Sequence, residues 1–235
     1  MPNFMSNESD TSLTPYMLIA GPILLMVAFI LWPAADYVGT RGTDSLAQEA
    51  DTLMPLLIAA SLGTMVMFGG LYLLNSEMMA NADGMNKQLL TVGSILIIAS
   101  LVAFIMGMGS NVSVINAENT DIDAVDPVGT YETEADQKDS QQNYFDAGST
   151  AWQMSPVTWG LAMIIIGFVA FSSQRPEGAM GFVLPSLMAV GTAFLAAPIL
   201  NEPSFFNIIF PVVMIFHIII GGLLLSGNLA VPGSE

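Results

Sequence analysis

Long apolar runs alternate with shorter polar segments along the chain. Six runs contain no Asp, Glu, Lys or Arg, and they lie at residues 16–33, 52–75, 89–110, 154–171, 179–200 and 205–226. A helix needs about 20 apolar residues to cross a hydrocarbon core of about 30 Å. The runs are apolar on every side, without the alternation of barrel strands or the polar stripe of a water-facing helix. The pattern predicts an all-α, polytopic integral membrane protein, a bundle of six transmembrane helices.

The same pattern divides the chain into five segments. We expect a polar N-terminal tail at 1–15, helices 1–3 within 16–110, a long acidic loop at 111–150, helices 4–6 within 151–226 and a C-terminal tail at 227–235. The loop between helices 3 and 4 carries nine acidic residues and one base, Lys138. A loop of this length is usually functional or disordered. The N-terminus lacks the basic region and cleavage site of a signal peptide, so we expect the first run to remain in the protein.

The few basic residues say little about orientation. Arg41, Lys87, Lys138 and Arg175 divide equally between the two sides of the predicted membrane, and Lys and Arg in short loops are what normally sets topology. The connections on the side of the two termini are less acidic than those on the opposite side. This difference favours two cytoplasmic termini in the cell membrane, with the 111–150 loop facing outward.

Composition removes several classes of function. Charged residues make up 10% of the chain, hydrophobic residues 53%, and the net charge is −16. Such an acidic exterior is typical of proteins in very salty surroundings. Nucleic-acid partners are excluded because phosphate binding needs Lys and Arg clusters. The chain has no cysteine, which excludes disulfides, thiolate metal sites and thiol catalysis. No acid lies inside an apolar run to partner a nucleophile or a base, so we expect no enzyme.

Three motifs suggest metal binding or modification, and each has a simpler explanation. The carboxylates of Asp121–Asp126 suit a hard cation, but the Gly and distal Glu of an EF-hand loop are missing, and a solvated acidic surface is favoured. The 17 methionines suggest a copper relay, but neighbouring Met pairs point apart on a helix and fit a packing role. The glycosylation pattern at 111–113 is short enough to arise by chance. We expect no metal and no cofactor.

His217, the one histidine, lies near the middle of the sixth run. An ionisable residue at this depth is a functional candidate by default. A haem ligand, a proton relay and a substrate-orienting donor are the functional alternatives; the last would be helped by hydroxyls at Ser61, Thr64, Thr158, Ser186 and Thr192. A bis-histidine haem site needs a second histidine, and a relay needs other titratable groups. We favour a neutral ring bonded to a hydroxyl or a freed carbonyl on a neighbouring helix.

A polar site near the membrane midplane remains a candidate. Pro211 lacks the N–H that would bond the carbonyl of Asn207, which leaves a polar spot on the helix of His217. The candidate site therefore comprises His217, Asn207, Ser186 and Thr192.

Small residues recur every four positions in two of the predicted helices. They let helix backbones approach closely in a bilayer, where lipid provides no hydrophobic drive for association. The series are Ala99, Ala103 and Gly107 in the third helix and Ala189, Ala193 and Ala197 in the fifth. Each series could pack against another helix of the same chain or against a helix of another chain.

Two functional hypotheses follow. The first, which we favour, is a non-catalytic structural or accessory subunit that assembles with other membrane chains, or with itself, in the lipid bilayer. The second is a small-solute transporter or channel made of two inverted three-helix halves, with a midplane site near His217. A polar, water-accessible cavity at midplane would favour transport, and a filled core would favour assembly.

Overall fold

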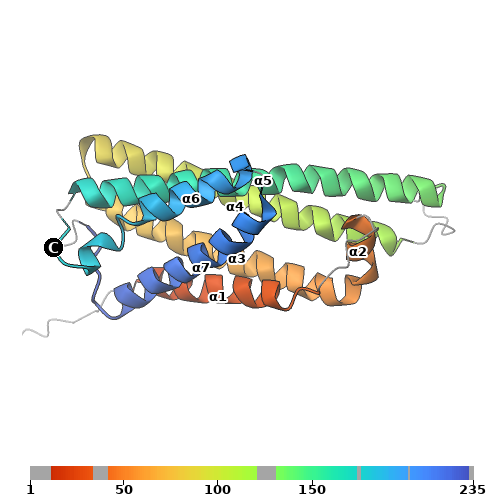
Figure 1. Ribbon diagram of the computed structural model, residues 1–235, viewed down its shortest axis with the longest axis horizontal. Helices are drawn as coiled ribbons and strands as arrows, with labels where there is room; N and C mark the ends of the chain where they lie inside the picture. The colour runs from red at the N-terminus through yellow and green to blue at the C-terminus, as the bar shows by residue number, and fades with distance from the viewer. Residues whose placement is uncertain (1–11, 34–41, 121–130, 174–175, 201, 233–235) are drawn as a thin grey trace, which may run out of the picture.

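The computed structural model describes residues 12–33, 42–120, 131–173, 176–200 and 202–232. Within these ranges the fold is helical and contains no strand (Figure 1). The elements are α1 (Thr14–Ile30), α2 (Gly42–Gln48), α3 (Ala50–Ala80), α4 (Gly84–Glu118), α5 (Glu134–Ser173), the 3-10 turn η1 (Met180–Phe182), α6 (Leu187–Leu200) and α7 (Pro203–Leu225). The predicted all-α class is confirmed.

Five helical segments are long and apolar enough to cross a membrane. They are Ala50–Ala80, Gly84–Glu118, Glu134–Ser173, Met180–Leu200 and Ser204–Leu225. Each covers one of the predicted apolar runs, as expected for a multi-pass membrane protein. The remaining run forms α1, which is apolar but has 17 residues. A sixth span therefore stays a prediction.

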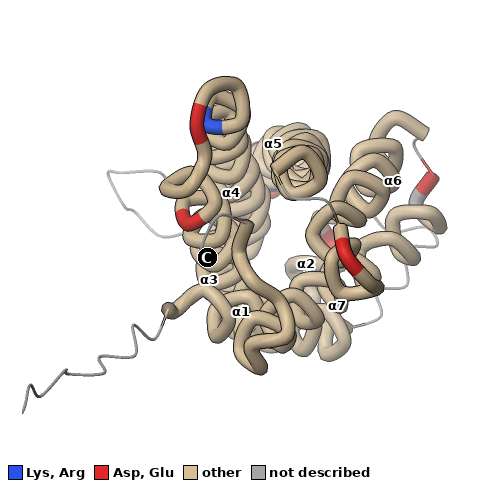
Figure 2. The backbone as a smooth tube through the Cα atoms, turned by 90° about the vertical axis from the view of Figure 1, so that its left-hand side faces the viewer, with Lys and Arg blue, Asp and Glu red and all other residues tan. Residues whose placement is uncertain are grey.

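The six longer helices form a closed ring. In chain order α1 packs on α3, α3 on α4, α4 on α5, α5 on α6 and α6 on α7, and α7 returns to α1. Seen end-on, these helices surround a common centre (Figure 2). α1 begins and α7 ends at the same end of the bundle, while the short α2 lies at the opposite end against α3, α4 and α5 (Figure 1).

Much of the predicted acidic loop is helical. α4 continues to Glu118 and α5 begins at Glu134, so the loop prediction is wrong for residues 111–118 and 134–150. Acidic composition does not prevent this helix, and the Lys138–Glu134 pair at 3.0 Å has the i, i+4 spacing that supports one. Asp121–Asp126 lies outside the described residues.

Glutamine side chains close the hairpin between α4 and α5. Gln137 Nε2 donates to the carbonyls of Ala117 at 2.7 Å and Thr120 at 3.2 Å. Gln141 Nε2 donates to Glu118 Oε2 at 2.7 Å. The last carbonyls of a helix lack their full intrahelical partners, so the Gln137 amide caps the end of α4, and the bond from Gln141 to the Glu118 carboxylate holds α5 beside it.

Small residues spaced seven apart bring α4 and α5 together. Gly107 faces Gly148, where an added Cβ on Gly107 would lie 3.4 Å from the Gly148 carbonyl oxygen. One repeat further along, Ser100 Oγ donates to the carbonyl of Ser155 at 2.8 Å, and Ser155 Oγ donates to the carbonyl of Ser100 at 3.2 Å. All four residues are buried. The seam thus combines close backbone approach with two hydrogen bonds across the interface.

The predicted packing residues lie in and beside such seams. On α4, Gly107 is buried, whereas Ala99 and Ala103 are half-buried next to the contact face. Residues that face the neighbouring helix recur about every 3.5 positions, and so every seven, because a packed helix presents one stripe of its surface to its partner. Residues spaced four apart gradually leave that stripe.

On α6 a glycine lies very close to the backbone of α5. An added Cβ on Gly191 would lie 2.6 Å from the carbonyl oxygen of Gly160 on α5, and one on Gly160 would lie 2.7 Å from that of Gly191. Ala189 is exposed, Ala193 is half-buried and Ala197 is buried.

Candidate functional site

His217 is completely buried on α7. Its Nδ1 lies 2.7 Å from the carbonyl oxygen of Val213 on the same helix. Because a carbonyl only accepts, Nδ1 carries the proton and donates, which leaves Nε2 as an acceptor in the neutral ring. Nε2 has no hydrogen-bond partner among the described residues. The hydrogen bond of His217 therefore stays within α7, whereas the sequence favoured a partner on a neighbouring helix.

Trp159 of α5 packs against His217. The two ring centroids are 5.5 Å apart with an edge-to-face orientation. Trp159 also contacts Phe68 of α3 at 4.8 Å and Phe194 of α6 at 5.0 Å between centroids. Its Nε1, like His217 Nε2, is buried without a hydrogen-bond partner among the described residues. His217 thus adjoins an aromatic cluster.

This cluster extends through the centre of the ring. Trp152 stacks near Phe104 with centroids 4.5 Å apart, and Phe210 contacts Phe29 at 5.3 Å and Phe206 at 5.5 Å. Every helix of the ring contributes at least one member. The rings are Phe29 from α1, Phe68 from α3, Phe104 from α4, Trp152 and Trp159 from α5, Phe194 from α6, and Phe206 and Phe210 from α7. Aromatic side chains therefore fill the centre of the bundle.

The other three residues of the predicted midplane site have separate surroundings. Asn207 is exposed near the start of α7, ten residues before His217 and so about 15 Å away along the helix. Ser186 Oγ donates to the carbonyl of Val183, and Thr192 Oγ1 to that of Met188, each at 2.7 Å. Both hydroxyls are thus satisfied by their own turn, and neither bonds His217.

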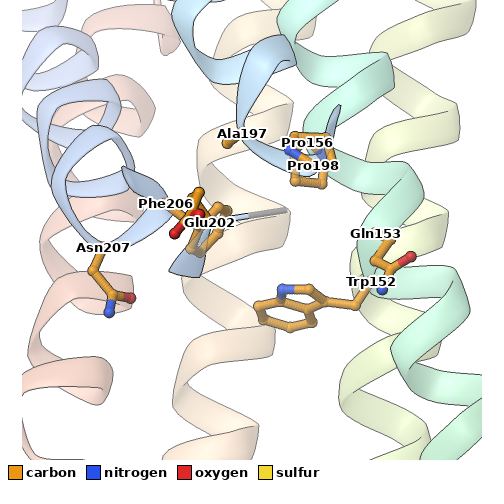
Figure 3. A pocket seen from close by; sticks show the side chains of 8 residues that line it. All are labelled: Trp152, Gln153, Pro156, Ala197, Pro198, Glu202, Phe206 and Asn207. Carbon is orange, nitrogen blue, oxygen red and sulfur yellow. The ribbon is translucent and has the colours of Figure 1, made fainter. Parts of the chain in front are cut away.

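A cavity of about 210 Å³ opens beside Trp152, where α6 gives way to α7. Three elements contribute its walls (Figure 3). They supply Trp152, Gln153 and Pro156 from α5, Ala197 and Pro198 from α6, and Glu202, Phe206 and Asn207 from the start of α7. The Trp152 indole projects from α5 toward the space between these elements. Glu202 is the one charged residue in this lining.

Two further cavities adjoin the one beside Trp152. A small one of about 10 Å³ lies among the aromatic rings and shares Trp152, Pro156 and Phe206 with it. Another of about 440 Å³ shares Trp152 and Gln153 and extends toward Phe29 and Phe145. Trp152 therefore stands between the aromatic centre and two cavities.

A cavity of about 510 Å³ involves other parts of the chain. Its lining includes Ala170 and Glu177 from the end of α5 and beyond, Met180 of η1, and Asn228 after α7. It shares no residue with the cavity beside Trp152. In the described part of the chain, no group of three or more His, Asp and Glu side chains lies close enough to hold a metal ion.

Several buried polar and aromatic residues were not predicted as important. Ser100, Ser155 and Asn75 make hydrogen bonds between helices; Asn75 Nδ2 donates to the carbonyl of Leu90 and to Ser94 Oγ, both at 2.8 Å. The seven-residue spacing of Trp152 and Trp159 in the sequence was a signal that both face the same side of one helix.

No family model matches the chain, and neither a curated protein nor a solved structure is significantly similar to it.

Proposed function

We propose that the protein is a non-catalytic multi-pass membrane subunit that assembles with another membrane chain or with a second copy of itself. The single observation that carries this proposal is the filled centre of the ring. Aromatic side chains from all six longer helices meet there, and the one buried histidine bonds its own helix. A chain whose interior is packed in this way acts through its outer surface.

In this proposal α1 is the sixth span, and both termini are cytoplasmic in the cell membrane. Two observations support it. α1 packs against α3 and α7 as an equal member of the ring, and α1 begins at the end of the bundle where α7 finishes (Figure 1). Two termini at one end fit an even number of crossings.

The outer face of α4 is the surface that we propose for assembly. In its most apolar window 28% of the residues are buried, the smallest share among the five candidate spans. The exposed side chains follow one helix face and include Ile95, Ile98, Val102 and Met106. Gly109 continues that face with open space around it. Small residues beside large aliphatic ones are what membrane helix interfaces use.

Cysteine cross-linking tests this surface directly, because the natural chain has no cysteine. Ile98 on α4 and Ile215 on α7 are 51% and 50% exposed, so Ile98→Cys and Ile215→Cys are a matched pair. We expect native membranes treated with a thiol cross-linker to give a discrete larger species from Ile98→Cys and little from Ile215→Cys. Purification in nanodiscs without cross-linker should recover the same partner.

A single unpartnered chain in nanodiscs, with equal cross-linking at both positions, would contradict the assembly proposal. A cross-linked species of twice the chain mass would assign the partner as a second copy, and a different mass would assign another membrane protein.

Small-solute transport is the second candidate, and the cavities beside Trp152 and near Glu177 favour it. Alternating access would require the aromatic centre between the two helical halves to open. Flux of a tracer into vesicles containing the purified protein, lost on Trp152→Ala, would support transport over assembly.

A further inference from the structure

The cavity beside Trp152 has an electronegative lining. Glu202 supplies a carboxylate, and the cavity is lined by no Lys or Arg. The last turn of α6 contributes Ala197 and Pro198, and the C-terminal end of a helix carries partial negative charge from carbonyls without partners. The electrostatic character of the space therefore suits a cation.

Two prolines add carbonyl oxygens without intrahelical donors. Pro156 of α5 and Pro198 of α6 both line the cavity and lie near each other (Figure 3). Each lacks the N–H that would bond the carbonyl four residues earlier, which belongs to Trp152 in one case and Phe194 in the other. Both of these residues line the small cavity next to the larger one. These carbonyl oxygens and the end of α6 have the same sign as the Glu202 carboxylate, whereas the first turn of α7, which also lines the cavity, carries the opposite partial charge.

Aromatic rings provide much of the remaining wall. Trp152 and Phe206 line the cavity, and both are half-buried, so their rings are held in place while remaining accessible from the space. The face of an aromatic ring attracts a cation, with tryptophan the strongest, and alkylated ammonium groups are bound in this way. A metal ion would need several oxygen ligands in a compact shell, and beside the Glu202 carboxylate the lining offers two side-chain amides, those of Gln153 and Asn207.

We propose that this cavity binds a small methylated ammonium compound, with Glu202 as the counter-charge and Trp152 and Phe206 as the aromatic walls. A volume of about 210 Å³ accommodates a small organic molecule. Methylation matters because a quaternary nitrogen has no N–H groups to satisfy and presents only methyl groups to the rings. The binding site is independent of the proposed assembly role, since it lies between α5, α6 and α7 rather than on the outer face of α4.

Titration of the purified full chain in nanodiscs tests the site. The probes are tetramethylammonium and choline chlorides, with ammonium and sodium chlorides at the same ionic strength as reference salts. We expect tetramethylammonium and choline to change the intrinsic tryptophan fluorescence saturably and to release or absorb heat in calorimetry. The reference salts should do neither.

Variants locate the binding. Glu202→Gln should weaken tetramethylammonium binding about fivefold, as expected for one partly solvated charge pair, and Trp152→Leu about 2- to 30-fold, the range of a cation–π contact. Glu177→Gln is the matched control because Glu177 lines the cavity near η1, and it should bind as the wild type does. Glu202 is exposed, so its substitution leaves the packed bundle intact; thermal unfolding of each variant verifies this.

Three results would overturn the proposal. The first is a wild-type response to tetramethylammonium no different from that to sodium. The second is equal affinity for ammonium and tetramethylammonium, which would indicate a general cation site. The third is Glu202→Gln binding within twofold of wild type while Glu177→Gln is impaired. Cross-linking at Ile98 has no bearing on any of these outcomes, so the ligand site and the assembly role can fail separately.

Discussion

The indole of Trp159 meets the imidazole of His217 edge to face inside the bundle, with ring centroids 5.5 Å apart and neither ring open to the surroundings. The contact joins α5 to α7 across the centre of the ring. It also gives the one histidine a packing role, because its Nδ1 bonds only the carbonyl of Val213 in its own helix.

We expect His217→Leu to be nearly neutral and Trp159→Ala to be severe. Leucine keeps most of the packed volume and loses no bond between helices, so the change should stay within about 1 kcal/mol. Trp159→Ala removes the hub of the aromatic cluster and should cost about 3–5 kcal/mol. Unfolding of both variants in mixed micelles measures the difference. Equal destabilisation would show that His217 makes an interaction between helices that the packing does not reveal.

Gly160→Ala should destabilise the bundle, whereas Gly222→Ala should not. An added Cβ at Gly160 would lie 2.7 Å from the carbonyl oxygen of Gly191, a backbone atom that moves only if α6 moves. Overpacking of this kind costs about 1–3 kcal/mol. Gly222 of α7 has nothing within 4 Å of an added Cβ, and alanine there should gain about 0.5–1 kcal/mol of helix stability. Melting temperatures that fall equally for both variants would contradict the assigned α5–α6 contact.

The serine pair between α4 and α5 should show energetic coupling. The two hydroxyl oxygens lie 3.1 Å apart, and either alanine variant removes this shared contact. The bonds to the two backbone carbonyls are lost one per variant, so they add and do not contribute to the coupling. Hydrogen bonds between membrane helices average about 0.6 kcal/mol. A double-mutant cycle of Ser100→Ala and Ser155→Ala should therefore give a coupling energy of similar size. Thr192→Val provides the control, because the Thr192 hydroxyl bonds its own helix. Strict additivity of the serine changes would argue against a hydrogen bond between the two hydroxyls.

The hairpin of α4 and α5 should loosen when Gln137 is replaced. Gln137→Leu removes the donors to the carbonyls of Ala117 and Thr120 and leaves the end of α4 without its partner. Hydrogen exchange should accelerate at the amides of 114–120 and 134–141. Gln142→Leu is the control, since Gln142 bonds exposed Asp146 of its own helix. Unchanged exchange in Gln137→Leu would mean that apolar contacts alone hold the hairpin.

Salt should stabilise the protein. The chain carries 20 acidic residues against four basic ones, and they lie outside the predicted apolar runs, so carboxylates repel one another at the two ends of the bundle. Raising the ionic strength shortens the Debye length from about 10 Å at 0.1 M to about 3 Å at 1 M and screens this repulsion. The melting temperature in nanodiscs should rise over this range of KCl. A flat or falling curve would remove the argument for a salty habitat.

Hydropathy predicted the positions of the helices because a helix that crosses a bilayer must be a continuous apolar segment, and such segments can be recognised directly in the sequence. The same criterion failed for residues 111–118 and 134–150, which are helical despite their charges. The two segments are joined by amides that reach the end of a neighbouring helix, those of Gln137 and Gln141. Hydropathy alone contains no information about such partners. The i, i+4 pair of Glu134 and Lys138 was the local sign that a helix continues there.

The polar site was harder to predict than the fold. Ser186 and Thr192 were grouped with His217 because all are polar residues in apolar runs, but each of these hydroxyls is satisfied by its own turn. Depth along a helix does not reveal which side of it faces the centre. The cavity beside Trp152 depends on the meeting of α6 and α7 at Glu202, and that geometry arises only when three helices are placed together.

The paired ends of α4 and α5 have a practical consequence. Beyond residue 110, α4 continues for about two turns, about 12 Å, and the side chains of Gln137 and Gln141 hold these turns beside α5. In the topology proposed above, these turns lie outside the lipid, and an antibody fragment bound to them would be held in a constant orientation relative to the whole bundle. A rigidly bound antibody fragment adds a feature outside the nanodisc, and such a feature makes it possible to align the images of a small membrane protein in electron microscopy.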